Sequence, residues 1–127
     1  MKSNLKNSVE QVQGKVPVTT FHLSGRLDIQ GEEDFVKWAS DAYQAGARYL
    51  LLDMSEVTML TSAGMRAIQK VYRMFTTEES TLETSHLKMA AAPPPVYEPL
   101  KMTGFLKTIP VFETVQSAIA AFKKQAA

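Results

Sequence analysis

The first quarter of the chain alternates apolar and polar residues as β-strands do. Residues 5–12 are polar with spaced apolar positions, which predicts an edge strand. Residues 16–23 alternate most clearly near their end, where Phe21 and Leu23 share one face of the predicted strand. We expect this second strand to be half-buried and to end at residues 24–25.

The apolar spacing becomes helical after Asp28. Three acidic residues at positions 32–34 suit the first turn of a helix, where the backbone dipole is positive. Phe35 and Trp38 then begin an apolar stripe with the period of an α-helix. We expect Gly46 to end this helix in a left-handed conformation.

Residues 49–54 are apolar throughout except for Asp53. Strands that are covered on both faces have this composition, so this segment is expected to lie in the middle of the sheet. A helical apolar period begins again at Met65 and predicts a second helix over residues 63–75.

The last third of the chain contains shorter segments. Residues 76–85 are polar and acidic without an apolar period, which predicts a mobile loop. The remaining predicted elements are a strand at 86–91, a turn or helix at 96–101 limited by Pro99, a strand at 109–112, and a final helix after Thr114 as its N-cap. Six predicted core residues come from three of the helices: Phe35, Trp38, Ile68, Tyr72, Ile119 and Phe122.

Two strands followed by alternating helices and strands predict an α/β (α+β) domain. We expect a mixed, mostly parallel sheet of four to five strands with about four helices packed against it. The length of 127 residues indicates a single domain over residues 1–127, with frayed ends at 1–4 and 124–127.

The composition excludes several classes of partner. The chain has 14 basic and 13 acidic residues and a net charge of +1, so no electrostatic footprint for nucleic acid or for an anionic membrane is expected. It has no cysteine and no apolar run long enough to cross a bilayer. We therefore expect a cytoplasmic protein that binds another protein and inserts into no membrane.

The chain offers few candidates for chemistry. His22 and His86 lack the spacing of metal ligands, and we expect neither a metal nor a cofactor. Asp28 and Asp53 could form an acid–base pair, but they suit cap and turn positions equally well. Since the sequence also lacks a phosphate-binding glycine loop and a catalytic constellation, we expect a protein that is not an enzyme.

Ser62 lies at the junction of the central strand and the second helix. The first backbone N–H groups of a helix lack partners within the helix, so this position suits a capping hydroxyl and equally an added phosphate. Ser62 is therefore either a plain N-cap, with Thr61 ending the loop, or a phosphorylation site.

Five segments carry a resemblance that covers nearly the whole chain. Residues 24–28 resemble the "G-x-L-D" of STAS domains, which are shared by sulfate transporters and anti-sigma factor antagonists. Residues 52–57 and 61–65 are similar to the family's "L-D-L-S-x-V … D-S-S-G-L". Residues 100–105 resemble "L-x-x-T-G-L", and residues 112–122 resemble the closing helix of the family.

The resemblance implies a bacterial anti-sigma factor antagonist. Such a protein sequesters an anti-sigma factor that has serine kinase activity and so releases a sigma factor for transcription. The kinase reverses the binding by phosphorylating the first serine of "D-S-S-G", which corresponds to Ser62. Thr61 stands where the family has aspartate, and it is a secondary candidate for the acceptor. Ala63 and Gly64 occupy the last two positions of the motif.

The same resemblance implies a partner-binding surface. It includes Asp28, whose loop lies beside the acceptor in the resembled fold, and the motif residues Thr61, Ser62, Ala63, Gly64 and Met65. An alternative function also remains open. The chain could be a STAS-type scaffold or a subunit of a lipid ABC transporter or of a stress-sensing complex. The oligomeric state is not determined by the sequence.

Overall fold

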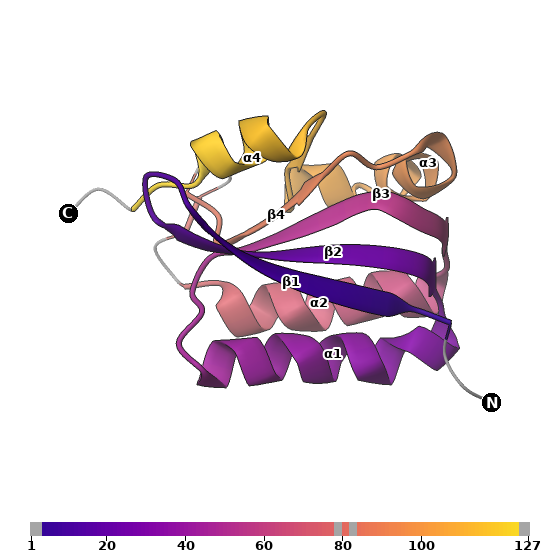
Figure 1. The fold of residues 1–127 in the computed structure, drawn as a ribbon. Coiled ribbons are helices and arrows are strands. Elements are labelled where there is room, and N and C mark those ends of the chain that lie inside the picture. Colours follow the sequence, from indigo (N-terminus) through magenta and orange to yellow (C-terminus); the bar gives the residue numbers. More distant parts are fainter. Residues whose placement is uncertain (1–3, 78–79, 82–83, 125–127) are drawn as a thin grey trace.

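The computed structural model describes residues 4–77, 80–81 and 84–124 (Figure 1). Within them, five strands and four α-helices follow the predicted order, with a short 3₁₀ helix, η1, before the last strand. The strands are β1 (Lys6–Gln13), β2 (Pro17–Leu27), β3 (Leu50–Leu60), β4 (Leu87–Ala90) and β5 (Val111–Phe112). The helices are α1 (Ile29–Gln44), α2 (Ser62–Phe75), α3 (Pro94–Met102), η1 (Phe105–Lys107) and α4 (Val115–Ala121).

The five strands form one sheet in the order β1-β2-β3-β4-β5. β1 is antiparallel to β2, and all the other neighbouring pairs are parallel. Helices α1 and α2 cover one face of the sheet, and α4 lies on the opposite face (Figure 1). The predicted mixed, mostly parallel sheet with helices packed on it is therefore confirmed.

Two hydrophobic clusters lie on the two faces of this sheet. The larger cluster joins the sheet to α1 and α2, and it includes the fully buried Phe35 and Ile68. The smaller cluster joins β2, β3 and β4 to α4, and it includes Phe122. The other three predicted core residues are partly buried against these clusters: Trp38, Tyr72 and Ile119.

Strands β2 and β3 are both longer than the sequence pattern predicts. β2 does not end at residues 24–25 but continues to Leu27, and β3 continues beyond Met54 to Leu60. The added halves pair with each other in parallel through two register shifts, one of them next to Gly25, whose φ is +98°. These irregularities break the simple alternation of apolar residues, which is why the pattern missed the extension.

The boundaries of two helices differ from the predicted ones. Asp28 is the N-cap of α1, which therefore begins at Ile29, and only Glu32 among the three acids lies in the first turn. Pro99 does not limit α3 but lies inside it. As the sixth residue of α3, Pro99 has no N–H to donate to the carbonyl group of Pro95, yet the helix continues through it to Met102.

The segment between α2 and β4 has no helix or strand in its described part, residues 76–77, 80–81 and 84–86. Residues 78–79 and 82–83 of the predicted loop lie outside the described residues, as do residues 1–3 and 125–127 of the predicted frayed ends. Asn4 is held in place, because its side-chain oxygen accepts a hydrogen bond from the backbone N–H of Arg26 at 2.8 Å. None of the described helices is long and apolar enough to span a membrane.

Candidate functional site

Thr61, not Ser62, is the N-cap of α2. Its backbone is extended, with φ −104° and ψ 175°, and its hydroxyl oxygen accepts a hydrogen bond from the N–H of Gly64 at 3.3 Å. Ser62 already has helical geometry as the first residue of α2. A capping side chain must come from the non-helical residue before the helix, so the interpretation of Ser62 as a plain N-cap is wrong.

The Ser62 side chain is left exposed by this arrangement. Its hydroxyl makes no hydrogen bond with any other described residue, while Ala63 and Gly64 after it are buried. The junction therefore has one hydroxyl that is engaged in the fold and one that faces solvent. The two candidate acceptors, Thr61 and Ser62, are thus structurally unequal.

The end of β2 lies directly against the start of α2. The backbone N–H of Thr61 donates to the carbonyl oxygen of Leu27 at 3.2 Å. The same carbonyl faces Gly64, where an added Cβ would stand 2.1 Å from the oxygen. The close approach brings Asp28, which follows β2, beside the start of α2, where Ser62 lies.

Asp28 has a structural task in this loop. Its Oδ1 accepts hydrogen bonds from the N–H groups of Gln30 at 3.0 Å and of Gly31 at 3.1 Å, which caps α1. Its Oδ2 lies 3.4 Å from Nε of Arg26. The Asp28 carboxylate does not contact Asp53, whose own partners are His22 and Ser55. The structure therefore supports Asp28 as a helix cap and not as half of an acid–base pair.

Three large apolar side chains are exposed around this junction. Ile29 opens α1, Met59 is the penultimate residue of β3 and Met102 ends α3; their exposed fractions are 72%, 46% and 83%. Met65 is half-buried and lies beside the end of α3, because the hydroxyl of Thr103, the residue after this helix, lies 3.7 Å from its sulfur. We call Ser62, Ile29, Met59, Met65 and Met102 the junction surface.

The sequence reasoning missed Ile29 as part of this surface. An apolar residue directly after an N-cap stands at the start of the helix, where it does not belong to the buried stripe that begins at Phe35. Its place directly after the N-cap is the sequence signal that could have identified Ile29 as exposed.

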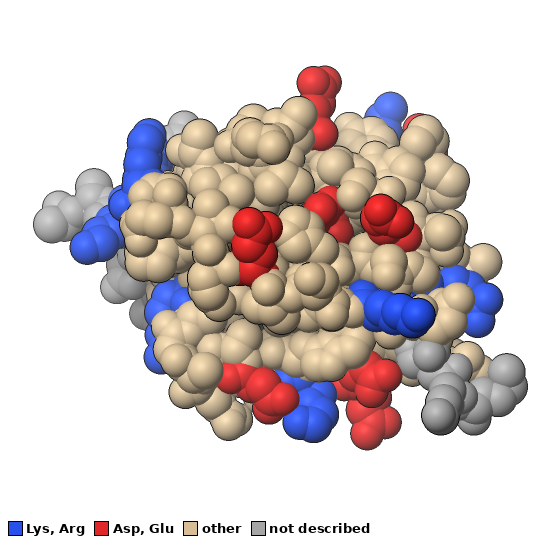
Figure 2. Space-filling model, in the orientation of Figure 1, with Lys and Arg blue, Asp and Glu red and all other residues tan. Residues whose placement is uncertain are grey.

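The start of α2 can accommodate negative charge. Its first turn contains no acidic residue, and the helix dipole makes this end positive. Arg66, which is exposed, lies four residues after Ser62, within the reach of an i, i+4 pair. The face that Figure 2 shows has no field of one sign, because basic and acidic side chains are scattered over it with wide uncharged areas between them.

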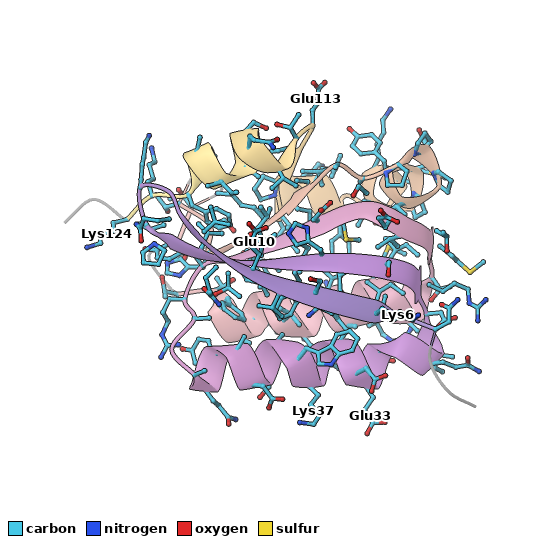
Figure 3. All side chains as sticks on the ribbon, in the orientation of Figure 1. Lys6, Glu10, Glu33, Lys37, Glu113 and Lys124 are labelled. Carbon is cyan, nitrogen blue, oxygen red and sulfur yellow. The ribbon has the colours of Figure 1, made fainter. Side chains whose placement is uncertain are left out.

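His22 is the centre of a polar cluster with Glu10 and Asp53, on the face of the sheet opposite to α1 and α2. Its Nδ1 lies 2.6 Å from Oδ2 of Asp53 on β3, and its Nε2 lies 2.8 Å from Oε1 of Glu10 on β1. Glu10 is labelled in Figure 3. The imidazole therefore links three adjacent strands. The sequence did not foresee this link, because Glu10, His22 and Asp53 are far apart along the chain and only the strand order brings them together.

The contacts shift the pKa values of both central groups. The hydrogen bond to Asp53, followed by the one to Glu10, raises the pKa of His22 above its usual value of 6.5. Burial lowers this pKa, but by less than the two hydrogen bonds raise it. Burial by itself would raise the pKa of Asp53, but the hydrogen bonds from His22 and Ser55 outweigh it and lower the pKa below 3.8. The pair is therefore most stable as an imidazolium and a carboxylate.

The remaining candidate ligands do not gather into a metal site. His86 lies apart from His22, stacks on Tyr49 and has its Nδ1 2.8 Å from the carbonyl oxygen of Arg48. Among the described residues, no group of three or more histidines and acids has an arrangement that could hold a metal ion.

Comparisons with known proteins agree with this geometry. A family model described as "STAS domain" matches residues 9–118. BtrV of Bordetella bronchiseptica, a protein named as a candidate anti-sigma factor antagonist, is 32% identical over 101 residues, which cover 80% of this chain and 83% of BtrV.

Two solved structures share the fold. An anti-sigma factor antagonist from Mycobacterium paratuberculosis superposes with a TM-score of 0.80 and 21% identity, over 98% of this chain and 100% of the other. The unphosphorylated form of the anti-sigma factor antagonist SpoIIAA superposes with a TM-score of 0.68 and 16% identity, over 90% and 93% of the two chains. With the family model matching most of the sequence, this chain belongs to the STAS domain family.

Proposed function

We propose that this protein is an anti-sigma factor antagonist that binds its partner through the junction surface and is released when Ser62 is phosphorylated. The observation that carries the proposal is the exposed Ser62 hydroxyl at the first position of α2, surrounded by exposed apolar side chains. The 32% identity to BtrV supports the partner class. The partner would be an anti-sigma factor with serine kinase activity, met in the cytoplasm, and the protein would act by binding and not by catalysis.

The exposed apolar residues favour docking of a protein. Ile29, Met59 and Met102 come from three different elements that meet at one end of the sheet. Flexible methionine side chains adapt to the shape of a partner, and their burial would stabilise the complex.

A phosphate on Ser62 would oppose that docking without unfolding the domain. It adds a charge of roughly −1.5 to −2. The positive end of α2 tolerates this charge in the free protein, while a partner seated on the apolar residues would have to remove its water. Binding to the partner would therefore become weaker, while the stability of the fold would stay the same.

The structure also favours Ser62 over Thr61 as the acceptor. The Thr61 hydroxyl is engaged with the N–H of Gly64, and a kinase would have to break that contact to reach it. Ser62 has no such contact within the described chain.

The test is a binding measurement with the kinase-type anti-sigma factor that a pull-down with the full chain recovers. We expect Ser62→Ala to bind as the wild type does and to take up no phosphate, and Ser62→Asp to bind at least tenfold more weakly, which is about 1.4 kcal/mol. Ser117→Asp is the matched control, because Ser117 is an exposed serine in the first turn of α4 on the other face of the sheet.

Mass spectrometry after incubation with the kinase separates the two neighbouring acceptors. Phosphate found on Thr61 alone, or wild-type binding by Ser62→Asp, would overturn the proposed regulation. Recovery of a transporter ATPase or of a large assembly of related STAS proteins would instead favour the scaffold function.

A further inference from the structure

A pocket of about 340 Å³ lies between the second half of α2 and the segment around η1. Gln69, Tyr72 and Arg73 of α2 line one side of it, and Phe105 of η1 lines the other. Ile109, which is buried, contributes an apolar wall. The volume lies in the range of natural sites for small molecules, about 300–1,000 Å³.

The polar groups of this pocket are available to a ligand. Within the described part of the chain, the side chains of Gln69, Tyr72, Arg73 and Thr108 make no hydrogen bond or ion pair with another residue. They come from α2 and from the end of the η1 segment, which are far apart in the sequence and meet at the pocket. A pocket that combines apolar walls with a few converging polar groups is the usual form of a small-molecule site.

The charge of the pocket favours a ligand that carries negative charge. Arg73 is its only charged lining residue, so the described lining carries one positive charge and no acid. A guanidinium presents two parallel N–H groups that match a carboxylate, and it stays charged at any physiological pH. Tyr72 and Gln69, one helical turn apart or less from Arg73, add hydrogen-bonding groups on the same side.

The apolar side of the pocket selects the body of the ligand. Phe105 and Ile109 line the same pocket as Arg73 and are its large apolar residues. An aromatic ring gains most from a flat apolar group stacked on it or set against its edge. We propose that this pocket binds a small organic acid that has one carboxylate, held by Arg73, and a flat apolar body, held against Phe105 and Ile109.

This site is separate from the junction surface but adjoins it. Thr103 lines the pocket and also contacts the sulfur of Met65, which belongs to the junction surface. Ser62 itself does not line the pocket. The proposal therefore does not depend on the identity of the protein partner, and it can be tested on the isolated chain.

The test is a titration of the full chain with cinnamate, followed by the backbone amide signals in NMR spectra. We expect saturable shifts at Gln69, Arg73, Phe105 and Thr108. Cinnamamide, the neutral analogue, and inorganic phosphate, an anion without an apolar body, should each bind at least fivefold more weakly. Equal binding of either control would overturn the assigned ligand class, and so would the absence of saturable shifts at the pocket.

Arg73→Gln should weaken cinnamate binding at least fivefold, and Arg73→Lys, which keeps the charge but loses the paired N–H groups, should have an intermediate effect. Lys107→Gln is the matched control, because Lys107 is an exposed cation of η1 that does not line the pocket. It should bind cinnamate as the wild type does. Equal losses in Arg73→Gln and Lys107→Gln would show a general effect of charge and would contradict the proposed site.

Discussion

Gly64 lies so close to the carbonyl oxygen of Leu27 that an added Cβ would stand 2.1 Å from that oxygen. The contact joins the end of β2 to the first turn of α2. It therefore fixes the position of Ser62 relative to the end of the sheet. Only glycine permits this approach, since any larger residue would push the helix away from the strand.

We expect Gly64→Ala to lower the free energy of unfolding by about 1–3 kcal/mol, because the added methyl group overpacks the junction. Gly31→Ala is the matched control. Gly31 also occupies the third position of a helix next to the end of β2, but its added Cβ would stand 3.1 Å from the nearest atom, the carbonyl oxygen of Arg26. The destabilisation of Gly31→Ala should be clearly smaller, because its added methyl group overlaps its neighbours less than the one at Gly64 does. The preference of alanine over glycine in a helix, about 1 kcal/mol, offsets part of the remaining cost. Urea denaturation measures both, and equal stability of Gly64→Ala and the wild type would contradict the packing.

The two hydroxyls of the junction should contribute unequally to stability. Thr61→Ala removes the cap of α2 and should cost about 1 kcal/mol. Ser62→Ala should change the free energy of unfolding by less than about 0.5 kcal/mol, because the exposed hydroxyl makes no hydrogen bond with any residue that the structure describes. The same denaturation experiment tests both variants, and a larger loss in Ser62→Ala than in Thr61→Ala would reverse their assigned roles.

The link between His22 and its carboxylates predicts a dependence of stability on pH. The pKa of His22 is raised in the folded protein, so its stabilising effect is complete below pH 6.5 and is lost as the pH rises through the folded value. The pKa of Asp53 is lowered, so its contribution is present above pH 3.8 and is lost as the pH falls through the folded value. The link should therefore be strongest between about pH 4 and 6.5.

His22→Gln should remove this dependence at the alkaline side. At pH 6 the variant should be less stable than the wild type by about 0.5–1 kcal/mol, a modest figure because the site is partly solvated. The difference should shrink toward pH 9, as measured by thermal unfolding in a series of buffers. A difference that stays constant from pH 6 to pH 9 would show that protonation of His22 plays no part.

Leu51 tests the placement of the central strand. It is fully buried in β3 and belongs to the cluster under α4. Leu51→Ala should cost about 2–5 kcal/mol, and Leu51→Asp should unfold the domain, because a buried unpaired carboxylate costs several kcal/mol against a total of about 5–15 kcal/mol. Circular dichroism distinguishes the cases, and a folded Leu51→Asp variant with an unchanged melting temperature would show that the strand is misplaced.

Local rules were enough to derive much of the fold from the sequence. The apolar run at residues 49–54 marked the centre of the sheet, since a strand covered on both faces must be apolar on both sides. Gly46 adopts the expected left-handed conformation, with φ +112°, and Thr114 caps α4 with a hydrogen bond from the N–H of Ser117. Each of these features depends on neighbours within a few residues.

The lengths of β2 and β3 required the tertiary structure. Their second halves are held by pairing across register shifts, and such pairing is decided between distant segments. The choice of Thr61 over Ser62 as the cap had the same origin. β3 extends to Leu60 and the N–H of Thr61 bonds to Leu27, so the chain stays extended through Thr61 and turns helical only at Ser62.

The sequence by itself therefore determined the element order, the buried strand and the position of the Ser62 hydroxyl near the start of a helix, because periodicity is local. Only the tertiary structure decided which residues surround that hydroxyl and which side chains pair across the sheet. Ile29 and Met102 reach the same end of the sheet, and Glu10 reaches His22, through the order of the strands. Contacts of this kind depend on how distant segments pack, and no local pattern contains them.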